Sequence, residues 1–171
     1  IYHIGLYYPI SMGNSPDQSP QNLTRRILSL KRGYEIDYFA YVLESEYLNL
    51  KSPTYIAVIP SHDPNKQESG ITQVARKLAR NRNISNITDC LQRTVNRGKL
   101  SSGKNRSLKI NIDSLKVTAP ERIENKNILL LDDVTTTGNS LRAGAILLNE
   151  SGASSQSGYV PPPGVTSLDF E

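Results

Sequence analysis

The chain has few of the residues that cross-link a protein or hold it in a membrane. Its 171 residues include one cysteine, Cys90, so no disulfide can form within the chain and no cysteine-based structural zinc site is available. No apolar run approaches the roughly 20 residues that cross a bilayer, and the N-terminus has no charged stretch followed by a long apolar core. These features predict a protein of a reducing compartment, with the cytoplasm as its location and no membrane partner.

The composition predicts a folded chain. Hydrophobic residues make up 37% of the sequence and charged residues 21%, which is far from the values typical of disorder. The length suits one domain with a hydrophobic core. We expect a folded domain over residues 1–153 and an extended or disordered tail over residues 154–171, where three consecutive prolines begin at Pro161.

Positive charge is concentrated in one stretch of the chain. The formal net charge is +4, but residues 76–109 contain ten Lys or Arg residues and one acid, Asp89, which leaves +9 there. Such a stretch favours an anionic partner, either nucleic acid or a compact polyphosphate. The alternative is a solvated helix face followed by a basic loop.

The order of apolar runs and turn residues predicts a parallel α/β sheet flanked by helices. Helices are expected from Ser19 and Pro20 to about Arg32 with Gly33 as the stop, and over residues 37–50, 70–80 and 141–149. Strands are expected over residues 1–8, 55–59, 108–112 and 128–131, with a weaker pattern over 84–91. Loops are expected over residues 11–21 and 93–107, and no internal repeat is present.

The segment ILLLDDVTTTGNS, residues 128–140, combines features that together indicate a ligand site. Ligands of open parallel sheets bind beyond the carboxyl ends of the strands, which is where Asp132 and Asp133 are expected. Two carboxylates can accept hydrogen bonds from the two neighbouring hydroxyls of a ribose. The next residues lead into a helix whose first N–H groups attract a phosphate, and Gly138 lets the backbone approach it closely. The structural alternative is that the acids end a strand and the threonines cap a helix.

This segment resembles the phosphoribosyl-diphosphate signature of type I phosphoribosyltransferases. The resemblance implies their open parallel sheet with a mobile loop, ribose binding and catalysis by Asp132 and Asp133, and a 5′-phosphate site. The residues implied for that phosphate site are Thr135, Thr136, Thr137, Gly138, Asn139 and Ser140.

A second segment, PSHDPNKQESGITQ from Pro60 to Gln73, is similar to ComF-type phosphoribosyltransferases. The positions that match are Pro60, His62, Glu68, Gly70 and Gln73, while Ser69, Ile71 and Thr72 stand where that family carries Arg, Phe and Asn. The turn after the strand lies where pyrophosphate binds in the family, so the resemblance implies pyrophosphate contacts for Ser61, His62 and Lys66. For His62 alone, a surface histidine with no role is an equal alternative. The helical segment ILSLKR, residues 27–32, extends the resemblance loosely.

The resemblance implies transfer of ribose 5-phosphate from phosphoribosyl diphosphate to an acceptor, with pyrophosphate as the leaving group. Mg²⁺ is implied by that chemistry, held by Asp132 and Asp133 through water. The basic loop 93–107 is the expected lid, with Arg93, Lys99, Lys104 and Arg106 as candidate pyrophosphate contacts, each weighed against plain surface charge. Thr136 occupies a position where several relatives carry an acid, and the acceptor is not identified.

Two other functions stay open on the sequence. One is a non-catalytic sensor of phosphoribosyl diphosphate or a related nucleotide that acts through a protein partner or as a homo-oligomer. The other, ranked third, is nucleic-acid binding through residues 76–109, in line with the DNA-related role of ComF-type proteins. No tyrosine falls within that stretch to stack on bases.

Overall fold

The structure is a computed structural model that describes residues 18–46, 55–62, 68–82, 84–95, 107–134 and 137–159. Its helices are α1 (Gln18–Lys31), α2 (Ile36–Glu46), α3 (Gly70–Arg82), α4 (Leu108–Asp113) and α5 (Asn139–Glu150), with a short 3₁₀ helix at Pro120–Arg122. Its strands are β1 (Tyr55–Val58), β2 (Ser85–Asn86), β3 (Leu91–Arg93), β4 (Leu115–Val117), β5 (Asn127–Leu131) and β6 (Ser155–Tyr159). The strand expected over residues 1–8 lies outside the described residues, as does the end of the helix expected over 37–50.

The main sheet has four parallel strands in the order β2-β1-β5-β6, and β3 and β4 form a separate antiparallel pair. In the main sheet Val58 pairs with Leu131, and Leu131 pairs with Tyr159. The carboxyl ends of β1, β5 and β6 therefore lie side by side at one edge. The predicted α/β architecture with a parallel sheet is confirmed.

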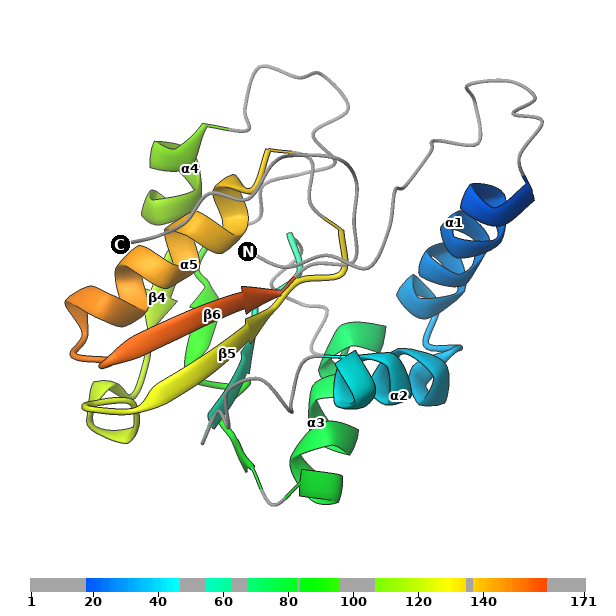
Figure 1. The fold of residues 1–171 in the computed structure, drawn as a ribbon. Coiled ribbons are helices and arrows are strands. Elements are labelled where there is room, and N and C mark those ends of the chain that lie inside the picture. The colour runs from blue at the N-terminus through cyan, green and yellow to red at the C-terminus, as the bar shows by residue number, and fades with distance from the viewer. Residues whose placement is uncertain are drawn as a thin grey trace.

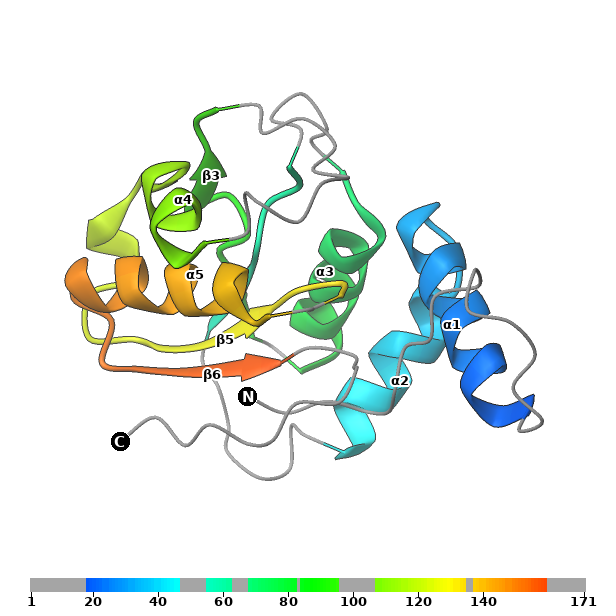
Figure 2. The same ribbon diagram turned by 90° about the horizontal axis from the view of Figure 1, so that it is seen from above.

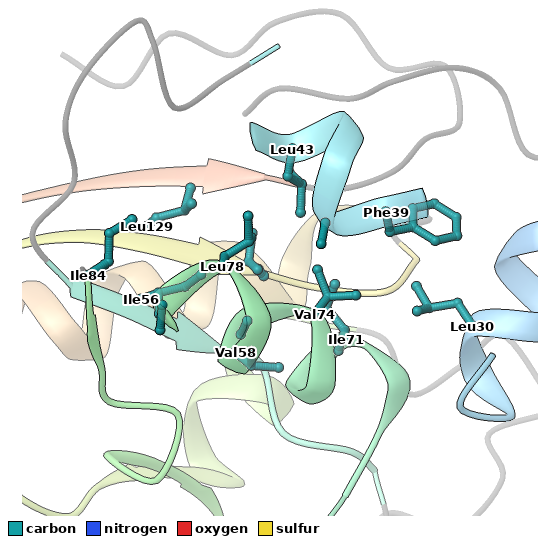
Figure 3. Close-up of a cluster of buried hydrophobic side chains, with 14 of the residues drawn as sticks. Leu30, Phe39, Leu43, Ile56, Val58, Ile71, Val74, Leu78, Ile84 and Leu129 are labelled. Carbon is teal, nitrogen blue, oxygen red and sulfur yellow. The ribbon is translucent and has the colours of Figure 1, made fainter. Parts of the chain in front are cut away.

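The two central strands are buried on both faces because helices cover each side of the sheet. Ile56, Val58, Leu129 and Leu131 pack with α1, α2 and α3 in one cluster (Figure 3). Ala57, Ile59, Ile128 and Leu130 point to the opposite face, and they pack with α5 and the β3–β4 pair. Figure 1 shows α5 on one side of β5 and α3 on the other, and Figure 2 shows α1 and α2 beside α3. Burial on both faces explains why these strands are continuous apolar runs.

The helices around the sheet follow local sequence signals. In α3, Val74, Ala75 and Leu78 are fully buried, as their helical spacing predicts. Ser69 begins this helix, because its Oγ accepts a hydrogen bond from the Thr72 N–H at 3.3 Å. Gly33 ends α1 in a left-handed conformation with φ of 87°, also as predicted.

Three expectations from the sequence are wrong. The segment expected as a strand over residues 108–112 is the helix α4, which begins where the Ser107 Oγ accepts from the Ile110 N–H at 3.3 Å. The weak strand over 84–91 is interrupted after the two residues of β2, because Asn86 Oδ1 accepts from the Thr88 N–H at 3.0 Å and turns the chain, and β3 begins only at Leu91. The loop expected up to residue 21 is already helical from Gln18.

The strand β6 lies within the segment expected to be an extended or disordered tail. Ser155–Tyr159 pairs in parallel along the whole of β5, so at least these residues belong to the main sheet. Within the part of the chain that the structure describes, no helix is both long and apolar enough to cross a membrane.

Candidate functional site

The acid pair lies at the carboxyl end of β5, as the sequence predicts. Asp132 directly follows Leu131, the last residue of the strand, and both acids are half-buried. The Ile59 N–H donates to the Leu131 carbonyl at 2.8 Å and continues the β1–β5 pairing past the end of β1. The turn that contains Ser61 and His62 therefore starts next to the acid pair.

Asp132 holds a proton more readily than an ordinary aspartic acid. Burial raises its pKa, and the negative charge of Asp133 raises it further. The Asp133 N–H donates to Asp132 Oδ1 at 2.9 Å, and this bond, together with the positive charges of Lys31 and Arg93, acts in the opposite direction. The raising effects prevail, so the pKa of Asp132 lies well above its usual value.

Lys31 is a site residue that the sequence analysis did not identify. Its Nζ lies 3.7 Å from Asp133 Oδ2, with both side chains partly exposed. Lys31 is the last residue of α1, so a helix about 100 positions earlier in the chain supplies a cation to the acid pair. The segment ILSLKR contained this lysine, but nothing in the sequence indicated its position beside Asp133.

The predicted phosphate-binding segment leads into α5 as expected. Gly138 immediately precedes the helix with φ of 71°, a left-handed conformation that favours glycine. Arg142 N–H donates to the Gly138 carbonyl at 2.9 Å as the first bond of the helix, so the earlier N–H groups face the preceding loop. Thr137 is exposed, Asn139 and Ser140 are half-buried, and Thr135 and Thr136 lie outside the described residues.

The turn after β1 is stabilised by hydrogen bonds from Arg93. Arg93 Nε donates to the Ser61 carbonyl at 2.9 Å, and Nη2 donates to the Pro60 carbonyl at 3.3 Å. The His62 side chain is exposed at the same edge, and Lys66 lies outside the described residues. Ser69, which stands where the ComF-type segment carries arginine, has its hydroxyl engaged at the start of α3.

The position of Arg93 differs from the one predicted for it in the lid loop. The sequence placed it in a mobile loop with its guanidinium directed at pyrophosphate, but it ends β3 and is only 9% exposed. Its Nη1 donates to Ser114 Oγ at 2.8 Å. Together with the two bonds to carbonyls, this means that the guanidinium group forms its hydrogen bonds inside the protein. Lys99, Lys104 and Arg106 lie outside the described residues.

Four of the five basic residues of α3 and α4 are paired with acids. The ion pairs are Arg76 with Glu68, Lys77 with Asp37, Arg82 with Glu44, and Lys109 with Asp113. All these side chains are partly or fully exposed, so the pairs contribute little stability. They do neutralise much of the charge that the sequence concentrates in residues 76–109.

The donor set fits a magnesium ion that is shared with a ligand rather than enclosed by the protein. Asp132 and Asp133 supply hard carboxylate oxygens, which Mg²⁺ prefers. No group of three or more His, Cys, Asp or Glu side chains suited to a metal occurs within the described ranges. The remaining ligands would be water and phosphate oxygens, which is the usual composition of magnesium sites at phosphates.

Comparison with known proteins shows the fold alone. No protein-family model and no curated protein sequence matches the chain. It resembles the solved structure of an allosteric regulatory enzyme of purine biosynthesis, with a TM-score of 0.52 and 15% identity over 75% of this chain. It also resembles glutamine phosphoribosylpyrophosphate amidotransferase from B. subtilis, with a TM-score of 0.51 and 17% identity over 73% of this chain.

The chain spans about a quarter of the length of each of these two proteins, since 25% of either is covered. The likeness confirms the fold that the motif predicted, an open parallel sheet flanked by helices. The narrower ComF-type assignment stays a prediction.

Proposed function

We propose that this protein binds phosphoribosyl diphosphate and transfers its ribose 5-phosphate group to an acceptor with release of pyrophosphate. The observation that carries the proposal is the β1–β5 register, which places the acid pair, the start of α5 and the turn at Ser61 around one edge of the sheet. The shared fold with a phosphoribosylpyrophosphate amidotransferase supports it.

Each part of the ligand has a matching part of the site. Asp132 and Asp133 would accept hydrogen bonds from the two ribose hydroxyls. Residues 135–140, at the positive end of the α5 dipole, would bind the 5′-phosphate. The turn with Ser61 and His62 would contact the pyrophosphate group, next to the positive charge of Arg93.

In the reaction, the bond between the anomeric carbon and the pyrophosphate oxygen breaks, and its electron pair leaves with pyrophosphate. A lone pair of the acceptor forms the new bond to that carbon. The negative charge of the acid pair would stabilise the positive charge that develops on the ribose. Mg²⁺, held by Asp132 and Asp133 through water, would neutralise the leaving group when bound.

A second candidate is a sensor that binds the same ligand without turnover and acts through a protein partner or a second copy of the chain. The observation in its favour is Ser69, whose hydroxyl begins α3 where the ComF-type segment has an arginine. A serine there cannot supply the phosphate contact that an arginine could make. Membership of the ComF-type family, a cytoplasmic location and any nucleic-acid role remain predictions alongside it.

Calorimetry with phosphoribosyl diphosphate and Mg²⁺ tests the site. The variant Asp132→Asn/Asp133→Asn should lose most of its affinity, because amides cannot replace two ionisable carboxylates. The matched control is Asp37→Asn/Asp113→Asn, which changes the net charge equally at two exposed ion pairs. Equal affinity in the two double variants would contradict the site assignment. Tight binding without pyrophosphate release, over a panel of nucleobases and amines, would reject transfer in favour of the sensor.

A further inference from the structure

A chain of buried and partly buried hydrogen bonds links two parts of the candidate site. Arg93, Asn111 and Ser114 are three of the four buried polar or charged residues among those described, and they are adjacent in space. Arg93 Nη1 donates to Ser114 Oγ at 2.8 Å, and Ser114 Oγ donates to the Asn111 carbonyl at 3.1 Å. The Ser140 hydroxyl in turn donates to Asn111 Oδ1 at 3.2 Å. We call Arg93, Ser114, Asn111 and Ser140 the buried relay.

The two ends of the buried relay lie in the two halves of the site. At one end, Arg93 donates to the carbonyls of Pro60 and Ser61 in the turn proposed for pyrophosphate. At the other end, Ser140 belongs to the first turn of α5, where the 5′-phosphate is proposed to bind. The relay therefore joins segments that are about 80 residues apart in sequence.

The buried members of the relay have their hydrogen-bonding groups paired, which opposes movement of either end. The Asn111 amide is used on both sides, since its Nδ2 donates to the Ser107 carbonyl at 3.0 Å while its Oδ1 accepts from Ser140. A shift of either end would leave a buried polar group without its partner, which is costly in a low-dielectric interior. The separation between the turn and the start of α5 is fixed as a result.

We infer that the buried relay sets the spacing of the two phosphate-binding ends, so that the site selects ligands phosphorylated at both ends of a ribose over ribose 5-phosphate or pyrophosphate alone. The inference rests on the proposed function and assigns its ligand selectivity to residues beneath the site. Arg93, Ser114 and Asn111 act here as positioning residues.

Two variants interrupt the relay in different places. Ser114→Ala removes the hydroxyl that connects Arg93 to Asn111, and Asn111→Leu removes the amide that holds Ser140. Ser114→Thr keeps the hydroxyl and serves as the rescue. Thr118→Ala is the matched control, because Thr118 Oγ1 also bonds a β3-side carbonyl, that of Asp89 at 3.0 Å, outside the relay.

Calorimetry with Mg²⁺ and three probes, phosphoribosyl diphosphate, ribose 5-phosphate and inorganic pyrophosphate, measures the selectivity. Ser114→Ala and Asn111→Leu should each raise the Kd for phosphoribosyl diphosphate about tenfold. This is the size of a typical coupling free energy between connected groups. The affinities for ribose 5-phosphate and for pyrophosphate should each fall less than about threefold, because either of these fragments contacts only one end of the site. Ser114→Thr and Thr118→Ala should bind all three probes as the native protein does.

The outcomes separate the inference from the function on which it rests. If the native protein binds phosphoribosyl diphosphate but the relay variants keep its affinity, or lose the fragments equally, the relay is a structural network only and the inference is wrong. If the native protein binds neither phosphoribosyl diphosphate nor ribose 5-phosphate, the proposed function fails and the inference fails with it. Thermal unfolding of each variant checks its fold, and Ser114→Ala, which removes a single oxygen atom, decides if Asn111→Leu does not fold.

Discussion

Replacing Arg93 by methionine should destabilise the protein and release the turn after β1. Methionine fills much of the space of the arginine stem but cannot donate hydrogen bonds. The carbonyls of Pro60 and Ser61 and the hydroxyl of Ser114 would each lose a bond to a charged donor, with present lengths of 3.3, 2.9 and 2.8 Å.

The expected loss follows from these three bonds. A hydrogen bond to a charged group contributes about 1.5–3 kcal/mol, and the two shorter bonds count in full. Relief of the cost of burying a guanidinium offsets part of the sum. We expect a net loss of about 3 kcal/mol, which lowers the Tm of a protein of this size by roughly 6–12 °C. The pKa of Asp132 should also rise further, because the positive charge of Arg93 lowers it in the native protein.

Chemical denaturation measures the loss of stability, and hydrogen exchange measures the release of the turn after β1. Arg93→Lys keeps the charge without the three-pronged donor geometry and should lose about half as much stability. Arg80→Met on the exposed face of α3 is the control and should change the free energy of unfolding by about 0.5 kcal/mol or less. The amides of residues 61 and 62 should exchange faster in Arg93→Met alone. A loss below about 1 kcal/mol with unchanged exchange would refute the anchoring role of Arg93.

Substitutions at three further positions test the electrostatics and the backbone of the site. Since the pKa of Asp132 is raised in the folded state, the stability that its protonated form provides is complete below the ordinary value of 3.8 and is lost as pH rises through the raised pKa. Asp132→Asn should therefore have a higher Tm than the native protein at neutral pH and no such advantage near pH 3; a lower Tm at neutral pH would contradict the raised pKa. Lys31→Met should raise the Kd for phosphoribosyl diphosphate about fivefold by calorimetry. It should lower the free energy of unfolding by no more than about 1 kcal/mol, the contribution of an exposed ion pair. An unchanged Kd would make Lys31 a surface residue only. Gly138→Ala should lower the free energy of unfolding by about 1–2 kcal/mol because of the φ of 71°, and it should weaken the binding of ribose 5-phosphate. Gly138→Asn should have a smaller effect because Asn tolerates this conformation. Equal Tm values for the native protein and both variants would argue against strain.

The sheet and the acid pair were predictable because their signals are local and strong. An apolar run such as residues 128–131 must be buried on both faces, and acids that follow it must lie at the carboxyl edge of a parallel sheet. The β1–β5 pairing, in which Val58 lies opposite Leu131, then places the turn that begins at Pro60 next to the acid pair.

The missed elements depend on contacts with distant parts of the chain. In α4, Leu108 and Ile112 are four residues apart, which fits a helix as well as an alternating strand, and packing against the second core cluster selects the helix. The segment Ser155–Tyr159 contains glycine and two serines, which are poor strand formers, but pairing with the whole of β5 makes it a strand. Arg93 stands among other basic residues, and no local pattern marks it as buried.

The same argument applies to the basic stretch, whose charge in sequence differs from its charge in space. Acids from two other segments, Asp37 and Glu44 of α2 and Glu68 before α3, reach the basic face of α3 and pair with it. Nucleic-acid binding through that face would have to break these pairs, so its affinity per basic residue would fall below that of an unpaired cluster. The positive charges of Lys31 and of the buried Arg93, by contrast, act on the acid pair at the sheet edge and make that edge more favourable for a small anionic ligand. The spatial arrangement of charge therefore favours a compact phosphorylated ligand at β5 over a polyanion along α3, and a nucleic-acid affinity that falls steeply with salt and disappears in Arg76→Gln/Arg80→Gln would overturn this preference.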